Sequence, residues 1–432
     1  MKISRWKLHS YITVFLLIAN SPLMWKCFVS IPDYITKSLL LFWCVIALFI
    51  GGKYKAGNKY ARVMLWIVVY LTVYIIGTHY DVGGSILNLL LTSLVFYSYS
   101  YIIQKKRKFE LLVDAYINVF CVLGRISLFF WFFGSVLDFL PFGRTMFYFW
   151  GNETNLTKTY FFLYFENAVQ NQNLLGLTIP RNCGIFPEAP GYSGLLLYAI
   201  GAAWFGKKKV DKTKIYLLLI TLISTQSTKA IITLVVVFIA KFMIDNKDVK
   251  SSSVRFLKLL FSGVLVAIGA FVVYAVVLDK MGTASYIVRM DDMNAALKTW
   301  RANKLFGTGY ENDLSIIANI TTPWLRNNNG LAMGLAVLLA EGGVFLTLFY
   351  IIAFVVGLKS MADRYLRIRY LLFSLLIVLN LLASNEAFSM VMILLVVTGY
   401  ASYASSRKHV TIADTKNTRA VSTTRLDEVN RI

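Results

Sequence analysis

The stretch KIYLLLITLISTQSTKAIITLVVVFIAK, residues 214–241, decides how the membrane spans of this chain are counted. Both terminal lysines belong on the cytoplasmic side if basic residues mark that side, and only 26 residues lie between them. At a rise of about 1.5 Å per residue, this segment is too short for two full membrane-spanning helices. The polar run at 224–229 stands in its middle, which predicts a short helical hairpin whose tip lies within membrane depth.

An irregular tip at that depth survives only where it is buried in protein or lines a wet cavity. We therefore expect a water-filled cavity, open to the outer side, near Lys229. The alternative is one long helix through the whole stretch. Such a helix would move every later segment to the opposite side of the membrane and would remove the charge asymmetry described below.

The composition of the chain is that of an all-α polytopic integral membrane protein. Of 432 residues, 57% are hydrophobic, whereas soluble domains average about 45–50% apolar residues. The apolar residues gather in blocks of about 17–25, the length that crosses a bilayer core. The sequence thus predicts one transmembrane domain over 1–405 and a disordered cytoplasmic tail over 406–432. The twelve predicted spans are 11–31, 37–52, 61–77, 84–103, 110–139, 191–206, 215–226, 227–244, 256–278, 331–357, 368–384 and 387–403.

The net charge of +22 follows the predicted topology. When the spans are assigned alternately, about 70% of the 44 Lys and Arg residues fall on one side, and such an excess in short loops marks the cytoplasm. Both termini are therefore expected inside, and two sizeable loops, 141–190 and 279–330, face outward. Because the charge is a topology signal, it argues against nucleic acid as a partner.

The first large loop ends in RNCGIFPEAPG, residues 181–191. Its glycines and prolines favour a tight, specific backbone, which would hold Arg181 and Glu188 close together just above the membrane. Arg181 could bind an anionic group through its fork of donors, and Glu188 could act as a general base or orient the arginine. The alternative is a salt bridge and a turn at the rim, without a catalytic role.

The second large loop contains SYIVRMDDMNAALKTWRANKLFGTG, residues 285–309. Its apolar residues recur at spacings of three and four, which predicts an amphipathic helix lying over the membrane domain. This apolar face consists of Met290, Met293, Leu297 and Trp300. The other faces carry Arg289, Lys298, Arg301 and Lys304. The helix could bind anionic lipid head groups, or it could be a lid whose arginines reach a phosphate in the cavity.

A substrate for these features is anionic, is presented at the outer membrane surface and is polar enough to need a wet cavity. A polyprenyl-diphosphate-linked sugar meets all three demands. The outer loops contain no Asp-x-Asp motif, and no nucleotide-binding glycine loop occurs. We therefore expect no metal and no cofactor, so that arginine and lysine would offset the charge of a diphosphate leaving group.

Several ordered pieces of this chain resemble the O-antigen polymerase family (Wzy-type), within the superfamily of O-antigen ligases and polymerases. The pieces are RNCGIFPEAPG at 181–191, STQSTKA at 224–230, Arg289 with Trp300 and LFGTG at 305–309, and NNGL at 328–331 with LAEGG at 339–343. The resemblance implies a glycosyltransferase of GT-C-like architecture in a bacterial inner membrane. It would transfer a growing glycan from undecaprenyl diphosphate to the next lipid-linked repeat unit, alongside a chain-length regulator and a flippase.

The resemblance also implies roles for individual residues. The expected diphosphate ligands are Arg181, Arg289 and Arg301, followed by Arg326 and Lys229. The candidate catalytic carboxylates are Glu188, favoured as the general base, and its rivals Asp291 and Asp292. The candidate acceptor contacts in the second loop are Asn328 and Asn329.

Two other functions remain open from the sequence. A ligase of the same superfamily is expected to carry a histidine near the end of the second large loop. Here the matching stretch is Arg326 followed by three asparagines, and that loop contains no histidine. A flippase or other transporter of lipid-linked oligosaccharides would favour two related halves, and this chain shows no internal repeat. Both functions are therefore less favoured than a polymerase.

Overall fold

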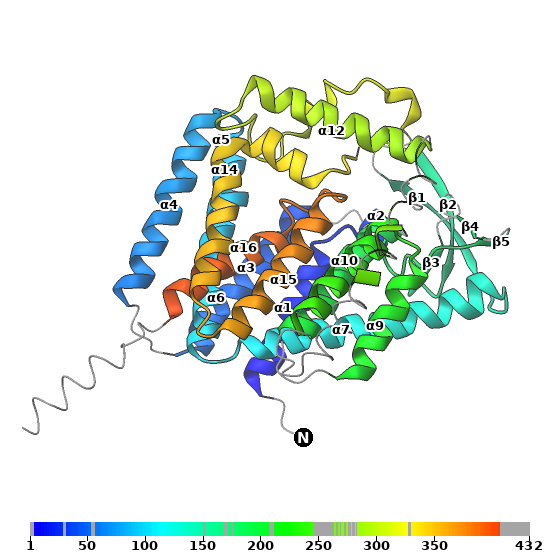
Figure 1. The fold of residues 1–432 in the computed structure, drawn as a ribbon, viewed down its shortest axis with the longest axis horizontal. Helices are drawn as coiled ribbons and strands as arrows, with labels where there is room; N and C mark the ends of the chain where they lie inside the picture. The colour runs from blue at the N-terminus through cyan, green and yellow to red at the C-terminus, as the bar shows by residue number, and fades with distance from the viewer. Residues whose placement is uncertain are drawn as a thin grey trace, which may run out of the picture.

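A computed structural model gives the fold of the chain (Figure 1). It describes residues 4–28, 32–52, 57–149, 153–166, 172–174, 177–206, 211–245, 283–326 and 330–406, together with isolated positions between 263 and 281. The predicted span 256–278 therefore falls largely outside the described residues. The predicted disorder of the tail and the acceptor residues Asn328 and Asn329 also fall outside them.

Long apolar helices form the frame of the molecule. Within the described residues, five helical segments are long and apolar enough to cross a membrane. They are α3 (Asp33–Ile50), α4 (Asn58–Thr78), the segment Val82–Lys105, the segment Phe109–Val136, and α14 (Gly334–Lys359). The third segment joins α5 (Val82–Ser85), η1 (Ile86–Leu91) and α6 (Thr92–Lys105), and the fourth joins α7 (Phe109–Phe130) and η2 (Trp131–Val136). This frame confirms the prediction of a helical membrane protein.

The remaining helices of the frame have 18 residues or fewer, and most coincide with predicted spans. They are α1 (Arg5–Ala19), α2 (Met24–Phe28), α8 (Ala189–Phe205), α9 (Lys212–Ser224), α10 (Thr228–Asp245), α15 (Arg364–Leu381) and α16 (Met390–Ser405). The predicted span over 11–31 is not one continuous helix in its described part. The first helix ends at Ala19, since Pro22 cannot continue it, and α2 begins where the amide of Met24 donates to the carbonyl of Ile185 at 3.0 Å.

The hairpin predicted from the lysine spacing is present. Helix α9 ends at Ser224 and α10 begins at Thr228, so three residues make the turn. Gln226 occupies the left-handed region with φ of 49°, which no continuous helix allows. The alternative of one long helix is therefore excluded, whereas the water-filled cavity near Lys229 stays a prediction.

The second large loop forms the predicted helix, but this helix buries a different face. Helix α12 (Ala284–Ala302) lies crosswise over one end of the frame (Figure 1) and packs against α14 and α13 (Asp313–Ile317). Its buried residues are Asp291, Asp292, Ala295, Ala296 and Thr299. The predicted apolar face is only partly buried. Small side chains allow close packing here, and the two aspartates bind a neighbouring loop instead of facing water.

The first large loop contains β-structure that the all-α prediction missed. The strands β1 (Gly143–Phe149), β2 (Glu153–Tyr160) and β3 (Tyr164–Glu166) form an antiparallel sheet in that order, with Thr145 opposite Thr157. A second antiparallel pair consists of β4 (Gln172–Leu174) and β5 (Leu177–Ile179). Aromatic and β-branched residues, which favour strands, are frequent in this loop. The all-α prediction therefore holds for the frame alone.

Helix α14 is broken at Gly343, whose φ of 60° and ψ of −171° are accessible almost only to glycine. The segment 305–309 fills this break through its backbone. The amide of Gly309 donates to the carbonyl of Glu341 at 3.0 Å, and the amide of Phe345 donates to that of Leu305 at 2.9 Å. The LFGTG and LAEGG pieces of the sequence are thus a single structural joint.

Replacement of Gly343 tests this joint. A Cβ atom there would lie 2.3 Å from the carbonyl oxygen of Leu305. We expect Gly343→Ala to lower the free energy of unfolding by about 1–3 kcal/mol from backbone strain alone, and by more from the overlap. Thermal unfolding of the detergent-solubilised protein measures the change. Gly83→Ala is the matched control because nothing lies within 4 Å of its Cβ position. Equal melting temperatures for both variants would contradict the joint.

Candidate functional site

The end of the first large loop is tied to the tip of the α9–α10 hairpin. Asn182 is fully buried, and its side-chain amide donates to the hydroxyls of Ser224 at 2.9 Å and Ser127 at 3.2 Å. Its backbone amide donates to the carbonyl of Ser224 at 3.0 Å. Beside it, Nε of Arg181 donates to the carbonyl of Thr225 at 3.0 Å. These bonds hold two segments distant in sequence as one unit.

Glu188 stands where this loop enters α8. It occupies the N-cap position, yet its side chain makes no capping hydrogen bond. The carboxylate instead lies close enough to feel the charges of Arg181, Arg289 and Lys229. Burial raises the pKa of Glu188, and the three cations oppose that rise. A carboxyl with a raised pKa beside fixed cations is suited to accept a proton.

Lys229 lies in the first turn of α10 and is only 7% exposed. Its Nζ atom makes no hydrogen bond to any described residue. The neighbouring charges are the carboxylates of Glu386 and Glu188 and the guanidinium of Arg289. A buried ammonium without hydrogen bonds is unfavourable. Nζ of Lys229 therefore needs acceptors that water or a ligand would supply.

Arg289 projects from α12 toward the same group. One guanidinium nitrogen, Nη1, donates to the carbonyl of Ala383 at 3.4 Å. Burial lowers the pKa of Arg289 and of Arg181, but guanidinium groups stay protonated in proteins. The structure therefore brings Arg181, Glu188, Lys229 and Arg289 together from three separate segments. We call these four residues and Glu386 the central cluster.

Glu386 is the member of the central cluster that the sequence analysis missed. It lies in the connection between α15 and α16, and its Oε2 accepts a hydrogen bond from the amide of Asn380 at 3.1 Å. Burial raises the pKa of Glu386, and Lys229 opposes the rise. The available signal was a lone carboxylate, in SNEAF at 384–388, at the junction of two apolar segments.

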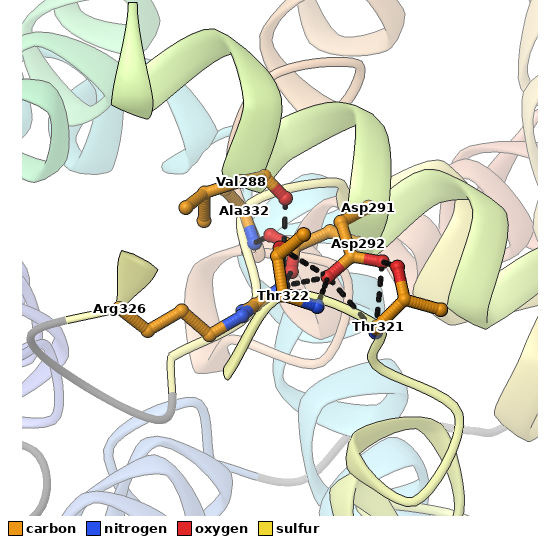
Figure 2. Close-up of polar contacts among 7 residues, drawn as sticks. All are labelled: Val288, Asp291, Asp292, Thr321, Thr322, Arg326 and Ala332. Atoms are coloured by element: carbon orange, nitrogen blue, oxygen red, sulfur yellow. Dashed lines mark hydrogen bonds and ion pairs between the residues drawn. The ribbon is translucent and has the colours of Figure 1, made fainter. Parts of the chain in front are cut away.

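Asp291 has a different environment from the central cluster (Figure 2). Its carboxylate accepts the hydroxyl protons of Thr321 at 2.7 Å and Thr322 at 2.6 Å, as well as the backbone amides of both residues. Burial alone would raise the pKa of Asp291, but these donors together bring it well below its usual range. These hydrogen bonds hold the loop, and they leave the Asp291 carboxylate oxygens without a free site to accept a proton from a substrate.

Asp292 and Arg326 complete the same attachment (Figure 2). Asp292 accepts hydrogen bonds from Nη2 of Arg326 and, at 2.9 Å, from the amide of Ala332. The same Nη2 lies 3.6 Å from the carboxylate of Asp291. We call Asp291, Asp292 and Arg326 the loop clamp, because they fasten Thr321, Thr322 and Ala332 to α12. Nε and Nη1 of Arg326 have no hydrogen-bond partner in the described part of the chain.

The last predicted ligand, Arg301, lies apart from the central cluster. It is exposed and follows Arg289 by twelve residues on α12, which is about 18 Å along the helix axis. The two arginines therefore cannot share one diphosphate. Across the described residues, no group of three or more His, Cys, Asp or Glu side chains could hold a metal ion.

The loop clamp is tested by Asp292→Asn. Removing this charge leaves the buried guanidinium of Arg326 without its closest carboxylate, and breaking a buried pair costs about 3–5 kcal/mol. We expect a lower melting temperature and faster trypsin cleavage within 321–332. Asp33→Asn is the control, because the Lys26–Asp33 pair has a 71% exposed carboxylate and such pairs contribute at most about 1 kcal/mol. A clamp variant as stable as the control would show that the clamp does not hold the loop.

Comparisons with known proteins leave the central cluster as the main evidence for function. No protein-family model matches the chain, and no curated protein is similar to it in sequence. The function is therefore inferred from the chemistry of the site and from the motif resemblance.

Proposed function

We propose that this chain is a polymerase of lipid-linked glycan repeat units, acting at the outer face of a bacterial inner membrane. The observation that carries the proposal is the central cluster. It gathers the buried Lys229 and the half-buried Arg181 and Arg289 beside two carboxylates, in a frame of long apolar helices. Such a group can hold a lipid diphosphate and accept a proton next to it.

The reaction follows from these two capacities. The hydroxyl of an incoming repeat unit attacks the anomeric carbon of the growing glycan, and the bond from that carbon to the diphosphate oxygen breaks. The hydroxyl proton passes to Glu188. Arg181 and Arg289 stabilise the negative charge that develops on the departing lipid diphosphate, and their anchoring to the carbonyls of Thr225 and Ala383 fixes the donors in advance.

The pairing of the sequence motifs supports the same proposal. The RNCG piece is bonded to the STQ piece through Asn182, and the LFGTG piece is bonded to the LAEGG piece across the break in α14. Segments that resemble one family in sequence therefore meet in two structural joints. One joint positions Arg181, and the other lies directly after α12, which carries Arg289.

The proposal includes the finer features of a polymerase in this family. They are twelve spans with both termini inside, a GT-C-like architecture, and an undecaprenyl-diphosphate-linked oligosaccharide as substrate within the bilayer. A chain-length regulator and a flippase are the proposed protein partners. The loop clamp and Arg301 have no direct part in the proposed reaction.

Deletion of the gene tests the class of activity. Loss of a polymerase leaves single-repeat glycans on a gel, loss of a ligase abolishes attachment of glycan, and loss of a flippase blocks its outer display. We expect Arg181→Ala and Arg289→Ala each to produce the single-repeat band when they replace the native chain. Arg301→Ala, an arginine on the same helix but apart from the central cluster, should keep the full ladder. A normal ladder in both of the first two variants would exclude the proposed diphosphate site.

The pH dependence of polymerisation tests Glu188. A base works only when deprotonated, so the rate should fall as the pH drops through the raised pKa of Glu188, above the usual range of a glutamate. Lys229→Met removes a cation that lowers this pKa, so the acid limb should move to higher pH. Glu188→Gln should reduce the rate about 10²–10⁴-fold. The measurement is the polymerisation rate of purified protein with a lipid-linked repeat unit over a pH series. An acid limb that is unmoved in Lys229→Met would exclude Glu188 as the base.

A further inference from the structure

A second group of polar side chains lies around Glu386. It consists of Glu386, Asn380 on α15, Tyr198 on α8 and Lys229. Asn380 and Tyr198 are buried, and the hydroxyl of Tyr198 lies beside Glu386 and Asn380. These four residues come from α8, α10 and the α15–α16 region, so the tertiary fold alone assembles them.

The absence of a side chain at Gly194 makes room for this group. A Cβ atom at that position would lie 2.3 Å from Oε1 of Glu386 and 3.3 Å from Nδ2 of Asn380. The carboxylate of Glu386 and the amide of Asn380 therefore pack directly against the backbone of α8 at Gly194. Gly194 follows Glu188 by six residues, which places the group about 9 Å farther along the helix axis.

The group contains buried hydrogen-bonding atoms that the described chain leaves unused. They are Nζ of Lys229, the hydroxyl of Tyr198 and Oδ1 of Asn380. Buried polar atoms in folded proteins are nearly always satisfied by protein, water or a ligand. Three such atoms next to a carboxylate therefore indicate a place for a polar ligand.

The charges and hydrogen-bonding atoms of these four side chains favour one class of ligand over others. A phosphate would meet the negative charge of Glu386, and an apolar molecule would leave the unused atoms unsatisfied. A hydroxyl group both donates and accepts hydrogen bonds. Neighbouring hydroxyls on one sugar ring could donate to Glu386 and to Oδ1 of Asn380 while accepting from Lys229.

We propose that Glu386, Asn380, Tyr198 and Lys229 form a subsite for a neutral, hydroxyl-rich sugar residue of the lipid-linked repeat unit. This subsite deepens the proposed polymerase function and rests on it. Arg181 and Arg289 hold the diphosphate, whereas the subsite holds the glycan. Lys229 stands between the two parts, and Glu386 and Asn380 bind sugar without taking part in proton transfer.

Two probes separate the subsite from the diphosphate site in the purified, full-length protein. The glycan probe is the host's own surface polysaccharide cut to single repeat units by mild acid, which carries neither lipid nor diphosphate. The anion probe is inorganic pyrophosphate. Calorimetric titration of each measures affinity without any need for catalysis.

We expect Glu386→Gln and Asn380→Leu each to weaken binding of the glycan by about tenfold, or 1.4 kcal/mol, while neither substitution weakens binding of pyrophosphate. Arg181→Ala should show the reverse pattern. Asn58→Leu, at an exposed asparagine, is the matched control and should change neither affinity. Tyr198→Phe, which removes one oxygen atom, provides a second variant if a buried substitution prevents folding.

Three outcomes would overturn the subsite. They are no binding of the glycan by the native protein, unchanged glycan affinity in both Glu386→Gln and Asn380→Leu, or equal loss of both probes in these variants. Failure of the polymerase proposal would give a different experimental result. In that case the gene deletion leaves no single-repeat band, whatever the two binding affinities are.

Discussion

The hydrogen bonds of Asn182 are the contacts on which the site depends. They join the end of the first large loop to the tip of the α9–α10 hairpin, and so they satisfy backbone and hydroxyl groups that water would otherwise have to reach. With the tip held, Lys229 begins α10 at a defined place, and Arg181 is fixed by the adjacent carbonyl of Thr225. The positions of both cations follow from one buried amide.

The second large loop is positioned by a different set of contacts. Helix α12 lies over the frame because the loop clamp binds 321–332 on one side and because 305–309 inserts into the break of α14 on the other. A helix with buried aspartates and alanines has little apolar surface to hold it, so polar contacts and backbone pairing take the place of hydrophobic packing. Arg289 reaches the central cluster through this arrangement.

Periodicity and charge predicted where helices occur in this fold better than which face of a helix is buried. The lysine spacing predicted the α9–α10 hairpin, and the spacing of apolar residues from Met290 to Trp300 predicted a helix in the second loop. The prediction of which face of α12 is buried was wrong, because two aspartates of this helix bind residues that lie thirty or more positions away in the sequence. No local pattern reveals such contacts. Arg181, Glu188, Lys229 and Arg289 were recognised individually, but Glu386 was not, since its importance comes only from the packing of α15 against α8 and α10.

The place of Glu386 in the chain has a consequence for biosynthesis. Domains assemble in the order in which they leave the ribosome, and a charge held within membrane depth is unfavourable until its partners arrive. Lys229 is synthesised long before Glu386, so the hairpin first forms with its ammonium unbalanced by that carboxylate. The connection between the last two helices supplies the missing charge. The site is thus the final part of the molecule to mature, and insertion of α15 and α16 completes both the frame and its chemistry.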